Sequence, residues 1–355
     1  MKVIQVTPRY YPHIGGIETH VREICRRLVK HNIDVTVVTT DPANSLSREE
    51  YIDGIKVKRF RGFAPSDSFY FCPGIYFFIK GKKCDIIHIH GYHVLSTLFA
   101  VISNRRDPSF IFTPHYHGAG HTIFRNILNK LYKPVGAWIF DKADRVICVS
   151  KYEMDLVKRD FNIPDFKLVM IPNGVNLEEF KGIEPTQKDH KTLLYVGRLE
   201  EYKGIQYIIK ALPQLSDYRF EIIGKGVYKN ELRRLAEKVG VSTRIDWLEG
   251  VSREVLLQHY ASADVFLMLS AHEAYGITVA EALASGTPCV VAIGSALEEF
   301  VDGERCIGIE APITTDKLIE AIKQLKNAEW DTKDLPISDW DDVTDRLMSV
   351  YGGVQ

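Results

Sequence analysis

Short apolar runs rich in β-branched residues alternate with amphipathic helical stretches along almost the whole chain. This alternation predicts parallel strands joined by right-handed crossovers, and therefore an α/β fold built from doubly wound sheets. Runs that are apolar on both faces, such as Asp85–His90, suit strands covered by helices on each side. We expect strands at 2–7, 34–40, 55–60, 85–90, 109–115, 145–150, 167–172, 192–197, 219–224, 244–248, 264–270 and 288–293.

The alternation is interrupted between Asn173 and Lys191 by a polar stretch that contains glycine and proline. Such a stretch is typical of an interdomain linker, and 355 residues exceed one ordinary core. We therefore predict one α/β domain over 1–172 and a second over 173–338. The amphipathic stretch from about 339 to 355 is predicted to form a final helix.

Composition excludes several classes of protein. The formal net charge is −1, so no global field recruits nucleic acid. The six cysteines form no C-x-x-C pair, which favours buried free thiols over disulfides or a zinc site. The sequence shows no signal-peptide core and no run of about 18 apolar residues, so we expect a cytoplasmic protein.

Ligands of open parallel sheets bind beyond the carboxyl ends of the strands. The first expected strand ends in a loop that places Gly15 and Gly16 directly before a helix. Their backbone amides could approach a phosphate, although a tight turn with a helix cap is the commoner use of such a pair. The loop lacks the G-x-G-x-x-G pattern of dinucleotide-dependent enzymes.

Two further loops carry charged residues in the second half of the chain. Arg198 and Lys203 follow an expected strand and could grip a diphosphate, or could pair with the neighbouring Glu200 and Glu201. In the segment from Ser270 to Pro288, a helix is expected from about Gly276 onward, preceded by Glu273 and containing Glu281. The small residues at its start leave amides for an anion, and the two carboxylates could hold a hexose and a ribose.

The pattern Glu273, seven residues, Glu281, together with the Gly-Gly loop and the Arg…Lys-Gly segment, resembles glycosyltransferase family 4 (glycosyl transferases group 1) of the GT-B superfamily. Further stretches that match in the right order are Asp85–His90, Ile171–Asn176, Gly224–Gly226 and Trp340–Val343. The resemblance covers nearly the whole chain. It implies two Rossmann-like domains that face each other across a cleft, with the final helix packed back on the first.

The resemblance also implies roles for individual residues. Arg198 and Lys203 would contact the donor diphosphate, and Glu273 and His115 would contact the transferred sugar. His117 is the alternative to His115, because the alignment of Phe112–Gly118 permits a shift of two residues. The remaining donor contacts would be the amides of Gly15, Gly16, Gly276, Ile277 and Thr278 at the diphosphate, Glu281 at the ribose and Val251 at the nucleobase. The family usually has Gly and Phe where this chain has Ala274 and Tyr275, which changes the expected sugar pocket.

We expect no metal ion and no cofactor. A metal reading rests on the histidines His88, His90, His93, His115, His117 and His121, of which His88 and His90 share one face of a strand. The spacing Asp339-Trp-Asp341 is that of an acidic metal motif, but its place at the start of the last helix favours an N-cap.

The implied activity is retaining transfer of a hexosyl unit from a UDP- or GDP-linked sugar to a glycan, lipid-linked or small-molecule acceptor. The alternatives are a sugar-nucleotide epimerase or a phosphorylase on the same fold, and an inactive scaffold that binds sugar nucleotides. All the side chains of the motifs are present, which argues against the scaffold.

Two segments of the first domain suit a membrane surface. Ser68–Lys80 is strongly aromatic and is followed by Lys82 and Lys83. Farther along, an apolar stripe lies beside basic residues in the stretch containing Ile123, Arg125, Ile127, Leu128, Lys130, Leu131 and Lys133. Both segments could instead pack against the sheet of the first domain. Only the membrane interpretation predicts peripheral contact with the inner face of a membrane.

Overall fold

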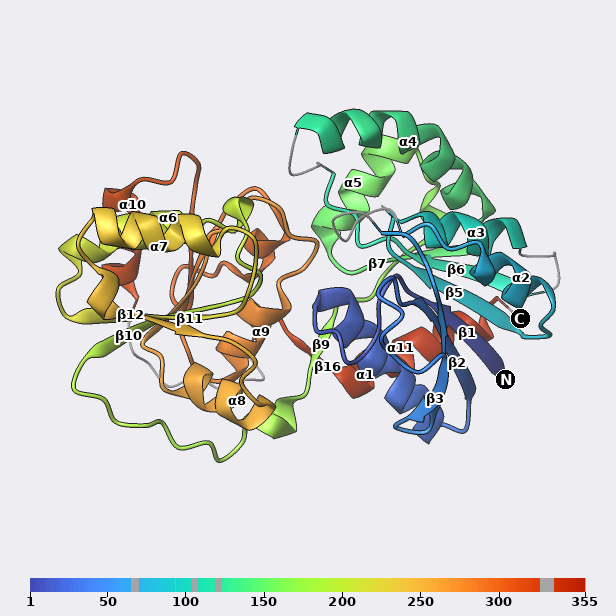
Figure 1. Cartoon of the computed structure of the whole chain (residues 1–355), viewed down its shortest axis with the longest axis horizontal. Helices are drawn as coiled ribbons and strands as arrows, with labels where there is room; N and C mark the ends of the chain where they lie inside the picture. The colour runs from blue at the N-terminus through green and yellow to red at the C-terminus, as the bar shows by residue number, and fades with distance from the viewer. Residues whose placement is uncertain (65–69, 93, 104–107, 119–122, 326–334, 355) are drawn as a thin grey trace. The chain divides into compact units, whose positions relative to one another are not determined.

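The computed structural model describes residues 1–64, 70–92, 94–103, 108–118, 123–325 and 335–354, drawn in colour in Figure 1. It divides into two compact units. Unit 1 comprises Met1–Gly174 and Ser338–Gln355, and unit 2 comprises Val175–Ile337. The side chains of 123–129 lie outside the description, and with them most of the apolar stripe expected there.

Unit 1 contains an eight-stranded sheet in the order β3-β4-β2-β1-β5-β6-β7-β8. All neighbouring strands are parallel except the hairpin of β3 and β4. The strand bounds are β1 Lys2–Val6, β2 Asp34–Thr40, β3 Glu49–Ile52, β4 Ile55–Phe60, β5 Ile86–His90, β6 Ser109–Thr113, β7 Arg145–Cys148 and β8 Leu168–Met170. The sequential order reverses direction between β1 and β5, and such a switch point is where ligands bind in open α/β sheets.

Helices cover both faces of this sheet because successive side chains of a strand point to opposite faces. Ile4 and Val6 of β1 pack in a core with α2 (Gly74–Lys80), α3 (Leu95–Ser103), α4 (Ile123–Lys142) and α5 (Lys151–Phe161). Val3 belongs to a second core with α1 (Gly16–Lys30) and α11 (Trp340–Gly352). In Figure 1, α2 and α3 accordingly lie on one side of β5 and β6, with α1 and α11 on the other.

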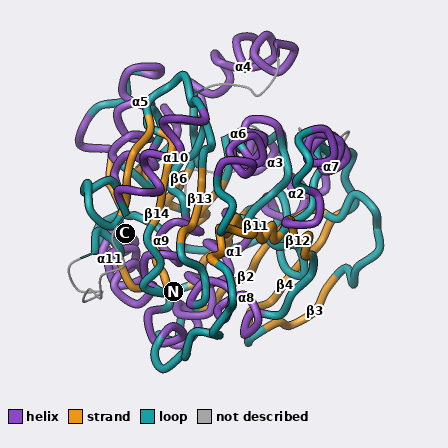
Figure 2. The backbone as a smooth tube through the Cα atoms, turned by 90° about the vertical axis from the view of Figure 1, so that its left-hand side faces the viewer, coloured by secondary structure: helices purple, strands orange, loops and turns teal. Residues whose placement is uncertain are grey.

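Unit 2 contains a six-stranded parallel sheet in the order β12-β11-β10-β13-β14-β15, with its switch point between β10 and β13. Its helices α6, α7 and α10 lie on one side of the sheet and α8 and α9 on the other (Figures 1 and 2). The strands are β10 Lys191–Val196, β11 Tyr218–Ile223, β12 Ile245–Leu248, β13 Val265–Met268, β14 Cys289–Ala292 and β15 Cys306–Ile309. The helices are α6 Ile205–Ala211, α7 Lys229–Lys238, α8 Arg253–Ala261, α9 Ile277–Ala284 and α10 Thr315–Gln324.

The predicted α/β fold with doubly wound sheets is confirmed, but four strands were not expected from the sequence. β3 is an edge strand in which exposed and half-buried residues alternate, so it lacks an apolar run. β15 is a short strand with Gly308 inside it. Two-residue strands, β9 (Gly174–Val175) and β16 (Ser338–Asp339), pair with each other. Within the described ranges, none of the helices has the length and apolar character needed to cross a membrane.

Candidate active site

The glycine pair of unit 1 lies at the switch point, between β1 and the start of α1. Gly15 is extended, and a Cβ there would overlap the carboxylate of Glu18, which would have to shift. That carboxylate accepts a hydrogen bond from Nε of Arg9 at 2.9 Å, which offsets its negative charge near the helix start. A Cβ at Gly16 would meet nothing within 4 Å, so the first turn of α1 borders open space.

His115 lies in the loop after β6 and has a left-handed backbone conformation with φ +48°. The buried Glu153 at the start of α5 holds this loop, because its two carboxylate oxygens accept hydrogen bonds from the amides of Tyr116 and Val149 at 2.5 and 2.6 Å. The His115 ring centroid is 5.2 Å from that of His20 and 5.9 Å from that of His90. His117 is half-buried two residues on, and the preference for His115 stays a prediction.

In unit 2, the loop after β10 brings Lys203 to the carboxylate of Glu273, which follows β13. Gly204 makes this approach possible: its φ is +77°, and a Cβ there would collide with the backbone of Leu269. The Ala271 amide also donates to the Tyr202 carbonyl at 3.0 Å. The Lys-Gly pair is therefore explained by close contact between the two loops at the switch point of this sheet.

Lys203 is a charged group in a nearly buried position, with 11% of its side chain exposed. Burial lowers the pKa of Lys203, but the adjacent Glu273 carboxylate more than compensates, so the pKa lies above its usual value. Arg198 differs, because 59% of its side chain is exposed and it pairs with Glu200 at 3.3 Å. The sequence left open that these cations pair with Glu200 or Glu201 instead of a diphosphate. Arg198 does pair with Glu200, whereas Lys203 pairs with Glu273.

The helix α9 begins after Gly276, which caps it at φ +117° in a site where a Cβ would come within 2.6 Å of Leu297. Gly276 has no side chain with which to cap this helix, and the amides of Ile277 and Thr278 in the first turn point toward its N-terminal end. Ala274 has no positive φ, and its substitution for glycine therefore strains nothing. The Tyr275 ring packs against Phe300 at 5.3 Å and is buried.

Glu281 is only 8% exposed and is held by two residues that the sequence did not single out. Arg253 at the start of α8 donates to it at 2.6 Å and also to Glu179 at 2.8 Å. The Tyr260 hydroxyl donates to the other Glu281 oxygen at 3.0 Å. Val251, the candidate for the nucleobase, is half-buried in the loop before α8. No sequence motif signalled Arg253 or Tyr260, because their role depends on tertiary contact with α9.

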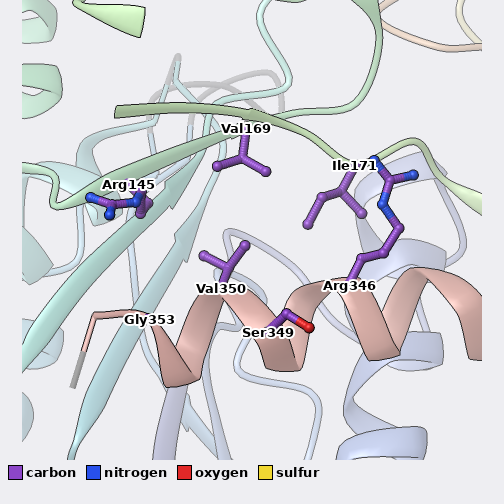
Figure 3. A pocket seen from close by; sticks show the side chains of 7 residues that line it. All are labelled: Arg145, Val169, Ile171, Arg346, Ser349, Val350 and Gly353. Atoms are coloured by element: carbon purple, nitrogen blue, oxygen red, sulfur yellow. The ribbon is translucent and has the colours of Figure 1, made fainter. Parts of the chain in front are cut away.

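A pocket of about 400 Å³ in unit 1 involves none of the candidate residues. It lies between α11 and the strands β7 and β8, with Arg145 and Arg346 at its two ends (Figure 3). Arg346 donates to the Met170 carbonyl at 2.5 Å. The lining includes Val169, Ile171 and Val350, and it offers no arrangement suited to transfer chemistry.

Both halves of the chain match families of known proteins. Residues 14–179 match the family described as Glycosyltransferase Family 4, and residues 176–335 match Glycosyl transferases group 1. An uncharacterized glycosyltransferase of Methanocaldococcus jannaschii is 29% identical over 333 residues, covering 86% of this chain and 83% of the relative. The GDP-mannose:cellobiosyl-diphosphopolyprenol alpha-mannosyltransferase of Xanthomonas campestris is 25% identical over 376 residues, covering 99% and 96%.

Solved structures show the same fold. Sucrose-phosphate synthase from Thermosynechococcus elongatus superposes with a TM-score of 0.82 at 18% identity, covering 99% of this chain and 98% of that one. Anabaena HepE in complex with UDP and glucose gives 0.77 at 16% identity, with 99% coverage of both chains.

Proposed function

This chain belongs to glycosyltransferase family 4 (glycosyl transferases group 1) and has the GT-B fold, and we propose that it transfers a hexosyl unit from a nucleoside-diphosphate sugar with retention of anomeric configuration. The proposal rests chiefly on the nearly buried pair of Lys203 and Glu273, three residues before Gly276 at the N-terminus of α9. A UDP- or GDP-linked donor is supported by the Xanthomonas relative, whose name gives GDP-mannose, and by Anabaena HepE, which was solved in complex with UDP. An epimerase, a phosphorylase or an inactive scaffold is not favoured.

The chemistry follows from where negative charge develops. As the glycosidic bond breaks, the leaving nucleoside diphosphate gains charge, which Lys203, Arg198 and the amides of Ile277 and Thr278 would stabilise. These groups are fixed before reaction, so little reorganisation is needed at the moment of bond cleavage. Because protein cations and amides stabilise the leaving group, we propose that transfer needs no metal ion at the diphosphate and no cofactor.

Sugar recognition would use the carboxylates. Glu273 would accept hydrogen bonds from hydroxyls of the transferred hexose, and Glu281, oriented by Arg253 and Tyr260, would accept from the ribose. From unit 1, the amides at Gly15 and Gly16 would contact the diphosphate and His115 the sugar. We propose attack by the acceptor on the same face that the leaving group vacates, without a covalent intermediate. Turnover of UDP- and GDP-hexoses in the presence of EDTA tests this proposal.

We propose that the acceptor is lipid-linked. The protein itself would be cytoplasmic and would bind peripherally to the membrane that holds the acceptor. The Xanthomonas relative is named for a diphosphopolyprenol acceptor. In unit 1, Phe71 and Phe77 near α2 are 49% and 71% exposed, and Leu131 of α4 is 72% exposed. The exposed lysines nearby are Lys82, Lys83, Lys130 and Lys133. Ile75 and Ile79 of the first segment are buried in the core, so only part of that segment is free to meet lipid.

We expect the protein to co-sediment with vesicles of anionic phospholipid at low salt and to be released at high salt, because surface cations bind such lipid electrostatically. Changing Lys82, Lys83, Lys130 and Lys133 to Glu should abolish sedimentation. A matched control changes the exposed lysines Lys210, Lys238, Lys317 and Lys323 of unit 2 to Glu and should still sediment. Failure of the wild-type protein to bind at any salt concentration would favour a soluble acceptor.

A further inference from the structure

Three imidazoles converge where β5 and β6 end in unit 1. His20 comes from α1, His90 is the last residue of β5, and His115 follows β6. Each ring offers one nitrogen to the group, and these nitrogens lie within 4.8 Å of one another. The sequence drew attention to His88 and His90, which share a strand face, but gave no reason to include His20. The three residues come from separate elements, so only the fold assembles them.

Burial favours the neutral form of all three rings. Burial lowers the pKa of His20 to about 4, and it lowers those of His90 and His115 well below the usual value. Their mutual proximity opposes protonation further for His90 and His115. A neutral imidazole carries one nitrogen with a lone pair, which is the form that binds metal ions.

Hydrogen bonds determine which nitrogen of His90 carries the lone pair. Nε2 of Gln5 donates to the Tyr351 hydroxyl at 2.9 Å, and this leaves Oε1 of Gln5 to accept from Nε2 of His90 at 2.8 Å. Nδ1 of His90 is therefore the bare nitrogen. It is buried and has no hydrogen-bond partner among the residues that the structure describes. A buried lone pair without a donor is costly unless a ligand occupies it.

The other two rings are arranged in a similar way. Nδ1 of His20 lies 2.7 Å from Oδ1 of Asn173, which fixes the proton on Nδ1 and leaves Nε2 as the lone-pair nitrogen. Nε2 of His115 is buried and likewise finds no partner in the described part of the chain. His88 differs, because Tyr351 and Thr113 bind its two nitrogens at 2.8 Å each. His88 therefore supports the network and is not a candidate ligand.

We propose that His20, His90 and His115 form a binding site for a late first-row divalent metal ion, with Zn²⁺ the best match. Amide oxygens that orient the non-ligating N–H of an imidazole, as Gln5 and Asn173 do here, are the usual support of histidine metal ligands. Three imidazoles with an open fourth position are an established zinc arrangement. A tetrahedral ion about 2.1 Å from each nitrogen needs donors about 3.4 Å apart, so side-chain shifts of roughly an ångström close the site.

The two cations of the leaving-group chemistry proposed above, Arg198 and Lys203, belong to unit 2 and are separate from this ion. The ion would, however, take the His115 imidazole that the proposed function offers to the transferred sugar. The inference does not rest on that function, because binding is measured on the protein without substrate. Occupancy would tie α1, β5 and the loop after β6 together. Added stability by mass action is then expected.

The test is titration of the metal-free protein with Co²⁺, followed by visible absorption, and then competition by Zn²⁺. We expect one saturable site with the intense absorption of tetrahedral Co²⁺, displaced by Zn²⁺, and a rise in Tm on addition of Zn²⁺. His115→Asn should weaken binding at least about 10-fold, the scale of losing metal-site contacts. Asn also tolerates the positive φ at this position. His90→Gln should act in the same way, and His31→Asn, which removes an exposed imidazole, should change nothing.

Absence of a saturable Co²⁺ signal in the folded wild-type protein would overturn the proposal. So would unchanged Co²⁺ affinity in His115→Asn, because the ion would then be held adventitiously elsewhere. If His90→Gln fails to fold, as judged by circular dichroism, His115→Asn and the wild-type titration decide the matter.

Discussion

Replacement of Lys203 by alanine is expected to lower kcat by about 10²- to 10³-fold, the scale observed when one donor that stabilises developing negative charge is removed. Lys203 holds a full positive charge in a nearly buried position against Glu273, which precedes α9, and water screens that charge little. Because the interaction strengthens only as the leaving group departs, kcat should fall more than the donor KM rises.

The matched control is Lys210→Ala, which removes an exposed lysine from α6 and should leave kcat unchanged. The measurement is release of nucleoside diphosphate at saturating donor, with circular dichroism and Tm confirming that Lys203→Ala is folded. If folded Lys203→Ala, in which Arg198 is unchanged, has the wild-type kcat, Lys203 takes no part in the mechanism.

Replacement of Glu273 by glutamine is expected to have the second-largest effect, with kcat reduced by about 10²-fold and the fold destabilised. Glutamine keeps the shape of the side chain but loses the charge that accepts strong hydrogen bonds from sugar hydroxyls. It also leaves Lys203 buried without its carboxylate, and breaking a buried pair typically costs about 3 kcal/mol. Glu249→Gln, which breaks the solvent-exposed pair with Lys229, should change stability far less.

The pH dependence of Glu273→Gln gives a second measure of the same pair. Glu273 raises the pKa of Lys203, so without it burial prevails and the pKa of Lys203 falls. Lysine is active here only when protonated, so activity should be lost as pH rises, at a lower pH in the variant than in the wild type. If activity falls at the same pH in both proteins, Glu273 does not control the charge of Lys203.

Alternation of apolar runs and amphipathic stretches was sufficient to predict both sheets, because buried parallel strands must be apolar on both faces. Charged and glycine-containing loops at strand ends could likewise be located, since a parallel sheet collects them at one edge. The edge strand β3 was missed because it faces solvent and has no apolar run. The family was also predicted from its motifs, and the comparisons confirm it.

Partners that depend on tertiary contact could not be predicted from the sequence. Arg253 is 28 residues from Glu281 along the chain, yet donates to it at 2.6 Å. The spacing of apolar residues in α1 predicts which face of the helix is buried, but not which residues that face contacts. The contact of His20 with His90 depends on how α1 packs beside β5. The pairing of Lys203 with Glu273, rather than with Glu200 or Glu201, is set by the closeness of the two loops at Gly204.

Metal-independent, retaining transfer from a nucleoside-diphosphate sugar is tested most directly by one measurement. The protein is incubated in EDTA with UDP- and GDP-linked α-hexoses and simple acceptors, and the first product formed is examined by NMR. We predict turnover of at least one donor in EDTA, with the α configuration retained in the product. A β-configured product, or turnover that stops in EDTA and returns with Mg²⁺ or Mn²⁺, would contradict this account.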